Sequence, residues 1–152
     1  MLNQDFKEFI QSLNSNNVRY LLVGGYALAA HGHPRYTKDL DIWVERDDSN
    51  AAKIIQALSQ FGFGSLGLTA NDFLLPDQVV QLGYPPVRID LLTSADGVDF
   101  LECFEKHLTV MIDGVEIALI DIESLCKNKR ATGRMQDLAD IEALGKLKDQ
   151  PS

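Results

Sequence analysis

The chain has 152 residues, 45% of them hydrophobic, and its 22 acidic and 14 basic residues give a net charge of -8. This length suits one domain, residues 1–152, with enough apolar residues for a two-layer core. The acidic balance argues against nucleic-acid binding over the whole surface, although it allows a local basic patch. No stretch approaches the roughly 18 apolar residues of a membrane helix and no targeting segment is recognisable, so we expect a cytoplasmic protein with reduced cysteines.

The apolar pattern switches between helical and strand spacing along the chain. β-branched and aromatic runs bounded by Gly, Pro or Asn predict strands, and Asp113-Gly114 predicts a tight hairpin turn. In chain order we predict a helix at 4–14, a strand at 18–23, a helix at 26–30, a strand from about 39 to 44, a helix at 51–61, a loop at 62–69, a helical turn at 71–75, antiparallel strands at 79–82 and 87–92, a helix at 99–106, a hairpin at 108–112 and 115–119, and helices at 121–128 and 135–147.

This order of elements indicates an α+β fold, with a mixed β-sheet and helices packed against it. The core should comprise about residues 18–120, and a helical part should follow at about 121–147. We expect the last helix to pack through Leu138, Ile141 and Leu144, which recur at helical spacing. Asp137 and Asp140 are then placed where they could fix Lys129 or Arg134.

Two carboxylates open the strand that begins near residue 39. Because strand side chains alternate between faces, Asp39 and Asp41 share one face while Leu40 and Ile42 share the other and bury. Like charges at that spacing repel unless a proton or a cation lies between them. Hard oxygen ligands of this kind suit Mg²⁺ or Mn²⁺. The alternative interpretation is a solvated strand edge with two unrelated acids.

Two further stretches favour the cation. The apolar run 18–23 ends at Gly24-Gly25 and a helix follows, an arrangement in which backbone N–H groups and glycine allow a phosphate to come close. Tight packing is the other common reason for such a turn. Asp90 interrupts the apolar run 87–92, in register with Arg88, and a carboxylate on a buried strand needs a partner. We predict that Asp90 lies beside Asp39 and Asp41 and shares their cation.

These stretches resemble the signature of the DNA polymerase β-like nucleotidyltransferase superfamily: apolar-Gly-Gly at 23–25, Asp-apolar-Asp-apolar at 39–42 and apolar-Asp-apolar at 89–91. More narrowly, Arg35 and Thr37 ahead of the aspartates, the run 88–93, and Lys129 with Arg134 are similar to small stand-alone bacterial and archaeal nucleotidyltransferases, including those of abortive-infection toxin–antitoxin systems. The resemblance extends over about residues 18–144.

The resemblance implies transfer of a nucleoside monophosphate from a nucleoside triphosphate to an acceptor hydroxyl, on a protein side chain or an RNA 3′ end such as that of tRNA. It implies two Mg²⁺ (or Mn²⁺) ions held by Asp39, Asp41 and Asp90, with Asp90 also lowering the pKa of the acceptor hydroxyl. A cognate toxin or antitoxin is an implied partner. The residues implied to contact the nucleotide phosphates are Gly24, Gly25, Arg35 and Thr37.

The basic stretch 127–134 carries four positive charges in eight positions and is the densest basic cluster of the chain. It is either a solvated loop or a cationic wall, with Lys129 and Arg134 facing nucleotide phosphates or an RNA backbone. Two other functions compete with the nucleotidyltransferase. A haloacid-dehalogenase-like phosphatase would place its aspartates at the carboxyl end of an apolar strand, whereas here the apolar run follows them. A non-catalytic nucleotidyltransferase-like antitoxin or nucleotide-binding module is the remaining alternative.

Overall fold

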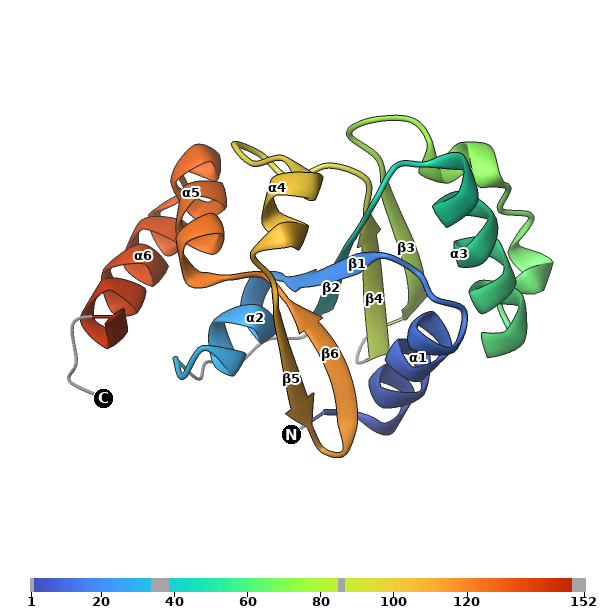
Figure 1. Ribbon diagram of the computed structural model, residues 1–152, viewed down its shortest axis with the longest axis horizontal. Helices are drawn as coiled ribbons and strands as arrows, with labels where there is room; N and C mark the ends of the chain where they lie inside the picture. Colours follow the sequence, from blue (N-terminus) through green and yellow to red (C-terminus); the bar gives the residue numbers. More distant parts are fainter. Residues whose placement is uncertain (1, 34–38, 85–86, 149–152) are drawn as a thin grey trace.

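A six-stranded sheet forms the centre of the computed structural model, which describes residues 2–33, 39–84 and 87–148 (Figure 1). The strand order is β3-β4-β2-β1-β6-β5. Strands β2 and β4, and strands β1 and β6, run parallel, whereas the other neighbouring pairs are antiparallel. The mixed sheet with its helices confirms the predicted α+β class. The strands are β1 (Tyr20–Val23), β2 (Asp39–Val44), β3 (Val79–Tyr84), β4 (Val87–Leu92), β5 (Leu108–Ile112) and β6 (Val115–Leu119).

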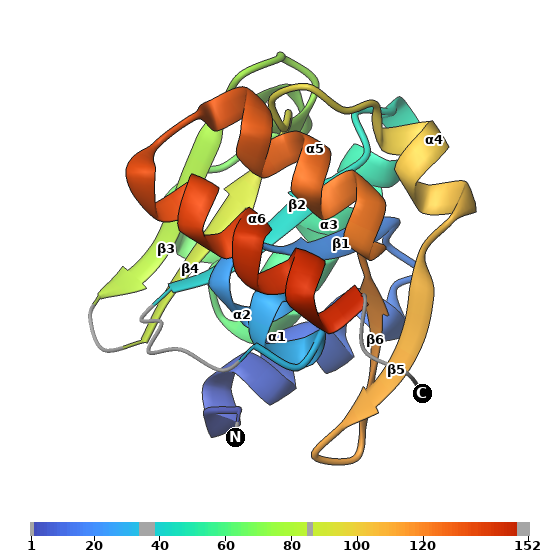
Figure 2. The same ribbon diagram turned by 90° about the vertical axis from the view of Figure 1, so that its left-hand side faces the viewer.

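Helices cover both faces of this sheet. Figure 1 shows α1 and α3 on one side and α2, α5 and α6 on the other, and Figure 2, turned by 90°, shows α5 and α6 crossing in front of the sheet. None of the helices in the described ranges is long and apolar enough to cross a membrane. The helices are α1 (Gln4–Ser15), α2 (Gly24–Ala30), α3 (Asp48–Phe61), α4 (Phe100–Glu105), α5 (Ile122–Thr132) and α6 (Met135–Lys148), with short 3₁₀ turns η1 (Gly64–Leu66) and η2 (Ala70–Phe73).

Burial follows the predicted alternation along β2. Leu40 and Ile42 are fully buried, while Asp39 and Asp41 remain partly exposed on the opposite face. Helix α1 contributes its apolar stripe to the core, and the hairpin turn has both Asp113 and Gly114 at positive φ, as tight hairpins require. The core side chains of α1 are those expected from their spacing: Phe6, Phe9, Ile10 and Leu13.

The C-terminal part differs from the sequence-based expectation in two respects. Helix α5 continues to Thr132 rather than ending near Asn128, so most of the basic stretch is helical. The prediction that Leu138 packs inward is wrong, since 52% of it is exposed, whereas Asp137 and Asp140 are buried together with Leu144. Acids replace the leucine at this interface because they pair with a cation of α5. The segment 62–69, predicted as a loop, contains η1.

Candidate active site

Four charged side chains form a rectangle on one face of the sheet. Strands β2 and β4 are parallel neighbours, with Asp39 opposite Arg88 and Asp41 opposite Asp90. Residues two apart on a strand share a face, and opposite residues on paired strands are close neighbours. The sheet therefore brings Asp90 beside Asp39 and Asp41, as predicted. The two aspartates of β2 lie at its amino end, consistent with the argument against a phosphatase of the haloacid-dehalogenase type.

Gly24 lies in close contact with the side chain of Asp41. Strand β1 runs antiparallel to β2 and pairs Val23 with Asp41, so the turn into α2 begins directly beside this carboxylate. Gly24 has φ +71°, and a Cβ atom at this position would lie 2.3 Å from Oδ2 of Asp41. Only glycine meets both conditions, which explains one half of the Gly-Gly turn. Gly25 is buried in the first turn of α2.

Charge repulsion within the rectangle is visible in the protonation of Asp41. Burial, followed by the charges of Asp90 and Asp39, raises the pKa of Asp41 from 3.8 to about 7. A hydrogen bond with Asp90 acts in the same direction, because the protonated form of Asp41 can donate to the neighbouring carboxylate. The raised pKa favours the protonated form of Asp41 below about pH 7, so without a cation a proton can relieve the repulsion for which the sequence predicted a cation.

Arg88 offsets part of this negative charge. Its Nε lies 3.1 Å from Oδ1 of Asp90 and 3.9 Å from Oδ2 of Asp39. A second guanidinium nitrogen lies 3.3 Å from Oδ2 of Asp90. The hydrogen bond to Asp90 raises the pKa of the guanidinium further. The sequence placed Arg88 in register with Asp90 and made it a possible partner of the β2 aspartates only if these acids are structural; an Arg-x-Asp pair on one strand is the signal for its contact with Asp90.

A cleft of about 520 Å³ opens over the carboxylates and is closed on its far side by α5 and α6. It unites most of the predicted site residues, namely Gly24, Asp39, Asp41, Asp90, Lys129 and Arg134. Arg35 and Thr37 lie outside the described residues, and Gly25 is not part of the wall. The wall residues that come from loops were not predicted, because their positions depend on chain reversals that no local pattern indicates. They include Asp77, Gln78, Ser94 and Asp96, and Asn128 of α5 also lines the cleft.

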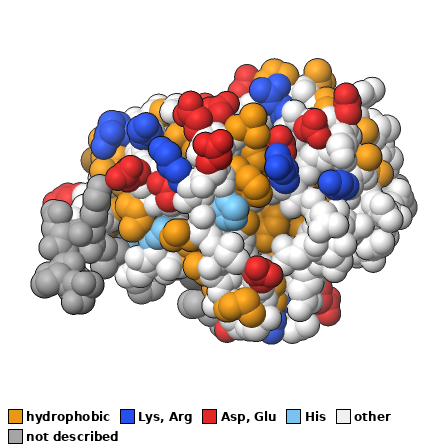
Figure 3. Space-filling view, in the orientation of Figure 1, with side chains coloured by type: hydrophobic (Ala, Val, Ile, Leu, Met, Phe, Trp, Pro, Cys, Tyr) orange, Lys and Arg blue, Asp and Glu red, His pale blue; other side chains and the backbone are white. Residues whose placement is uncertain are grey.

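The basic stretch is divided among different surroundings. Lys129 is buried, with Nζ 2.9 Å from Asp140 and 3.6 Å from Asp137. Arg134 remains exposed at the cleft, and its Nε lies 2.7 Å from Asp137. Lys127 lines a separate hollow. Figure 3 shows basic side chains over α5 next to acidic ones, so this face carries no continuous basic surface.

Asp137 connects the two cations of this stretch. Burial would raise its pKa, but hydrogen bonds from Arg134 and from the Thr132 hydroxyl hold it at about 2. Asp137 is thus ionised near neutral pH, and its carboxylate accepts hydrogen bonds from the Arg134 guanidinium. The predicted link between the acids of the last helix and both Lys129 and Arg134 is confirmed.

Comparison with known families matches residues 1–149 to a family described as "Nucleotidyltransferase of unknown function (DUF6036)". The chain belongs to this family. This DUF6036 chain also resembles two crystal structures: an antigenic nucleotidyltransferase-like protein from Paracoccidioides brasiliensis (17% identity, TM-score 0.56, 96% of this chain and 78% of that one) and a candidate nucleotidyltransferase from Thermotoga maritima (16% identity, TM-score 0.57, 95% and 91%). At these identities the likeness concerns the fold. No curated protein matches the chain.

The carboxylates of the DUF6036 chain suit a divalent cation of the Mg²⁺ type. Asp41 and Asp90 are close enough to share a proton, and their oxygens are the hard ligands that such cations prefer. Within residues 2–33, 39–84 and 87–148, no three His, Cys, Asp or Glu side chains converge on one metal position. Mg²⁺ is commonly bound by one or two carboxylates together with substrate phosphates, so the donor set fits a nucleotide-bound cation better than a pre-formed protein cage.

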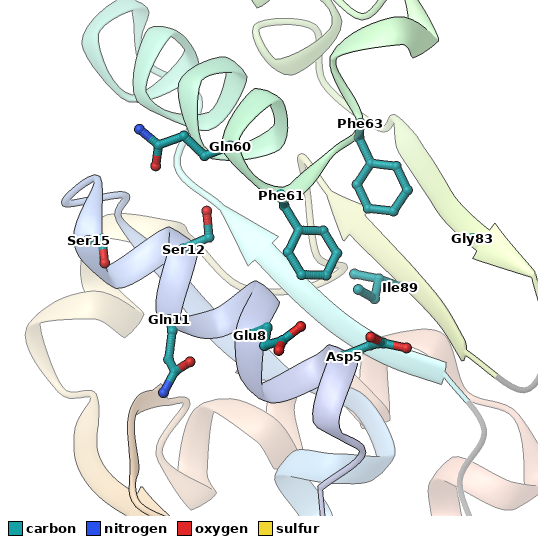
Figure 4. Close-up of a pocket in the computed structure, with 10 residues that line it drawn as sticks. All are labelled: Asp5, Glu8, Gln11, Ser12, Ser15, Gln60, Phe61, Phe63, Gly83 and Ile89. Atoms are coloured by element: carbon teal, nitrogen blue, oxygen red, sulfur yellow. The ribbon is translucent and has the colours of Figure 1, made fainter.

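A larger cavity, of about 730 Å³, lies on the other face of the sheet (Figure 4). Phe61, Phe63 and Ile89 form its apolar wall, and Asp5 and Glu8 of α1 approach from the solvent side. Ile89 alternates with Arg88 and Asp90 along β4, so this cavity is separated from the carboxylate cleft by the sheet itself. The larger cavity is therefore not the candidate active site, which is identified instead by the carboxylates on neighbouring strands.

Proposed function

We propose that this protein transfers a nucleoside monophosphate from a nucleoside triphosphate to an acceptor hydroxyl, on a protein side chain or an RNA 3′ end. The observation that carries the proposal is the register of Asp41 and Asp90 on neighbouring parallel strands, next to Gly24 and inside a cleft that also contains Arg134. Membership of a nucleotidyltransferase family supports the reaction class. The small stand-alone enzymes of toxin–antitoxin systems suggest a cognate partner protein as one acceptor.

The transfer makes one bond and breaks one. The acceptor oxygen attacks the α-phosphorus, the bond to the oxygen bridging the α- and β-phosphates breaks, and pyrophosphate leaves with that electron pair. Asp90 would lower the pKa of the acceptor hydroxyl, directly or through the cation, and so help to remove its proton. Asp39, Asp41 and Asp90 would hold Mg²⁺ or Mn²⁺, and a cation bound there would neutralise the triphosphate and activate the hydroxyl. Asp41 must lose its shared proton before it can act as a ligand.

Phosphate recognition would come from the two walls of the cleft. Gly24 lines one wall, where its backbone would approach the phosphates, and Arg134 lines the other with its guanidinium paired to Asp137. Lys129 contributes by fixing α6 against α5, because its ammonium is already engaged by Asp140 and Asp137. Arg35 and Thr37 precede β2 in sequence and are proposed to hold the triphosphate from the same end.

A second candidate function is a non-catalytic nucleotide-binding module or antitoxin. It is favoured by the contact of Arg88 with Asp90, because a guanidinium that neutralises the carboxylates reduces their need for a metal. The two candidates differ in a measurable way: only the enzyme consumes the triphosphate and leaves a labelled acceptor.

The decisive experiment incubates the protein with cell extract and each α-labelled nucleoside triphosphate, followed by mass spectrometry of the labelled products. The enzyme predicts Mg²⁺-dependent labelling that is lost in Asp41→Asn, and sensitivity of the product to protease or ribonuclease identifies the acceptor class. Calorimetry of ATP and GTP with and without the cation tests the binding step. Equal nucleotide affinity in EDTA would contradict the two-metal mechanism.

A further inference from the structure

Arg88 holds an unusual place for a cation in a metal-binding cluster. It is opposite Asp39 on the neighbouring strand and two residues ahead of Asp90 on its own strand, so its side chain lies on the same face as all three carboxylates. A structural arginine on this sheet could pair with an acid elsewhere, as Arg19 does with Glu45 at the other end of β2. Arg88 is instead directed at the proposed metal ligands.

The contact engages both oxygens of Asp90. Nε approaches Oδ1 at 3.1 Å and a terminal guanidinium nitrogen approaches Oδ2 at 3.3 Å, so the guanidinium meets the carboxylate through two parallel contacts. A carboxylate held in this way offers its accessible lone pairs to the guanidinium, and these are the lone pairs that a metal ion requires. The contact to Asp39, at 3.9 Å, extends the same competition to β2.

The two partners differ in how easily they can move. The Asp90 side chain is 9% exposed, whereas that of Arg88 is 32% exposed. On the outer side of Arg88, the residue opposite it on β3 is Gly83, which has no side chain to confine the guanidinium. Asp90 is therefore the fixed half of the pair and Arg88 the half that can leave.

We propose that Arg88 is a built-in counter-cation, which occupies Asp90 in the metal-free protein and is displaced when a divalent cation binds to the carboxylates. The inference rests on the proposed function, since it concerns the cation which that function uses. Its consequence is that metal binding without nucleotide is weakened by the cost of removing the guanidinium.

The change in metal affinity when Arg88 is removed shows whether Arg88 competes with the metal or only positions Asp90. If Arg88 only held Asp90 in a ligating orientation, its removal would weaken metal binding. If Arg88 competes with the metal, its removal strengthens metal binding. We expect Arg88→Met to bind Mn²⁺ about tenfold more tightly than the wild-type protein, from the usual strength of a hydrogen bond between charged groups.

The experiment measures Mn²⁺ affinity by the electron paramagnetic resonance of the free ion, without nucleotide, at about 0.15 M salt, where charges farther than roughly 8 Å are screened. Arg19→Met is the matched control: it also removes a sheet arginine paired with a carboxylate, and it should leave the affinity unchanged. Arg88→Lys, which keeps the charge but not the two-pronged contact, should give an intermediate gain and serves if Arg88→Met fails to fold. Asp41→Asn identifies the carboxylate site.

Equal or weaker Mn²⁺ binding in both Arg88 variants overturns the inference, as does a gain that persists when Asp41→Asn is added. The proposed function fails separately. If Arg88→Met binds Mn²⁺ more tightly at the Asp41-dependent site but neither protein labels any acceptor, the counter-cation is supported and the transferase is not. If the wild-type protein labels an acceptor but the Arg88 variants bind Mn²⁺ no more tightly, the transferase is supported and the counter-cation is not.

Discussion

The Lys129 ammonium lies 2.9 Å from the Asp140 carboxylate, in an interface where 5% of Lys129 and 1% of Asp140 are exposed. Asp137, 3.6 Å from the same nitrogen, adds a second carboxylate. Charges buried to this extent persist only when they are paired and hydrogen-bonded. Because the pair joins α5 to α6, it determines where the connection between these helices, including Arg134, lies relative to the cleft.

Replacing Lys129 by Met should lower the free energy of unfolding by about 3–5 kcal/mol, because the buried Asp140 carboxylate loses its ion pair with Lys129 while Asp137 keeps only its pair with Arg134. Denaturant unfolding at neutral pH measures the loss. Arg130→Met is the control, since Arg130 is exposed on the same helix and its replacement should change stability by no more than about 0.5 kcal/mol. If the two variants unfold at the same denaturant concentration, the buried pair does not hold α6 in place.

The second prediction concerns pH in the absence of metal. The folded pKa of Asp41, about 7, is higher than its ordinary value of 3.8, so between these two values the folded state binds a proton that the unfolded state has lost. The stabilisation is complete below the lower value and disappears as the pH rises through about 7. We therefore expect stability in EDTA to fall between about pH 4 and pH 7.

Asp41→Asn should remove this part of the pH dependence and be more stable than the wild-type protein at about pH 8, where the native carboxylate is ionised beside Asp90. Thermal melts at several pH values test it. Glu8→Gln, which changes an exposed acid on α1, is the control for general charge effects. A wild-type profile that matches the Asp41→Asn profile over this range would mean that Asp41 titrates normally.

Local periodicity made part of the carboxylate face predictable. Alternation along a strand places Asp39 and Asp41 together whatever the tertiary structure. Asp90 was expected beside them because a carboxylate on a buried strand needs a partner, and the parallel pairing of β2 with β4 brings it there. The Gly-Gly turn was also a local signal. Its closest contact, between Gly24 and Asp41, depends on the antiparallel pairing of β1 and β2 and is visible only in the structure.

The buried face of α6 could not be predicted from hydrophobic spacing. Leu138, Ile141 and Leu144 have helical spacing, and a helix with that stripe buried satisfies the apolar pattern. The helix is instead rotated so that Asp140 meets Lys129, eleven residues earlier in the chain, and Leu138 is exposed. Hydrophobic spacing within one helix cannot predict that a buried ion pair will take the place of a leucine, because the partner Lys129 comes from a different helix. A sequence pattern likewise cannot predict which of the neighbouring carboxylates the Arg88 side chain contacts.

The third prediction uses the close approach of Gly24 to Asp41. Gly24→Ala should lower the free energy of unfolding by more than the roughly 1 kcal/mol expected for a side chain at positive φ, because its Cβ must also displace the Asp41 carboxylate. Gly67→Ala is a matched control, with φ +73° and no atom within 4 Å of the added Cβ. The two variants share the backbone strain, so their difference in stability isolates the contact with Asp41.

Gly24→Ala should also lose Mg²⁺-dependent nucleotide binding, measured by calorimetry, whereas Gly67→Ala should keep it. If both variants lose the same stability and both bind nucleotide normally, the carboxylate can move aside without cost and Gly24 has only a conformational role.

The last prediction compares two arginines of the basic stretch. Arg134 is exposed at the cleft with its guanidinium held by Asp137, while Arg130 is exposed on α5 and does not line the cleft. Arg134→Lys keeps the charge but loses the planar fork that can bind a phosphate through two hydrogen bonds. We expect this change to weaken nucleoside triphosphate affinity by about tenfold, the effect of losing roughly one charge-assisted hydrogen bond.

Arg130→Lys, the matched control, should leave nucleotide affinity unchanged in the same calorimetric titration with Mg²⁺. Reversing the charges of Lys127 and Arg130 together tests the alternative role, because steering of a polyanionic acceptor depends on total charge and weakens with salt. If Arg134→Lys is silent and only the charge reversal weakens RNA binding, in a salt-dependent way, the stretch belongs to the acceptor. If neither change affects nucleotide or RNA binding, Arg134 serves only to pair with Asp137 at the start of α6.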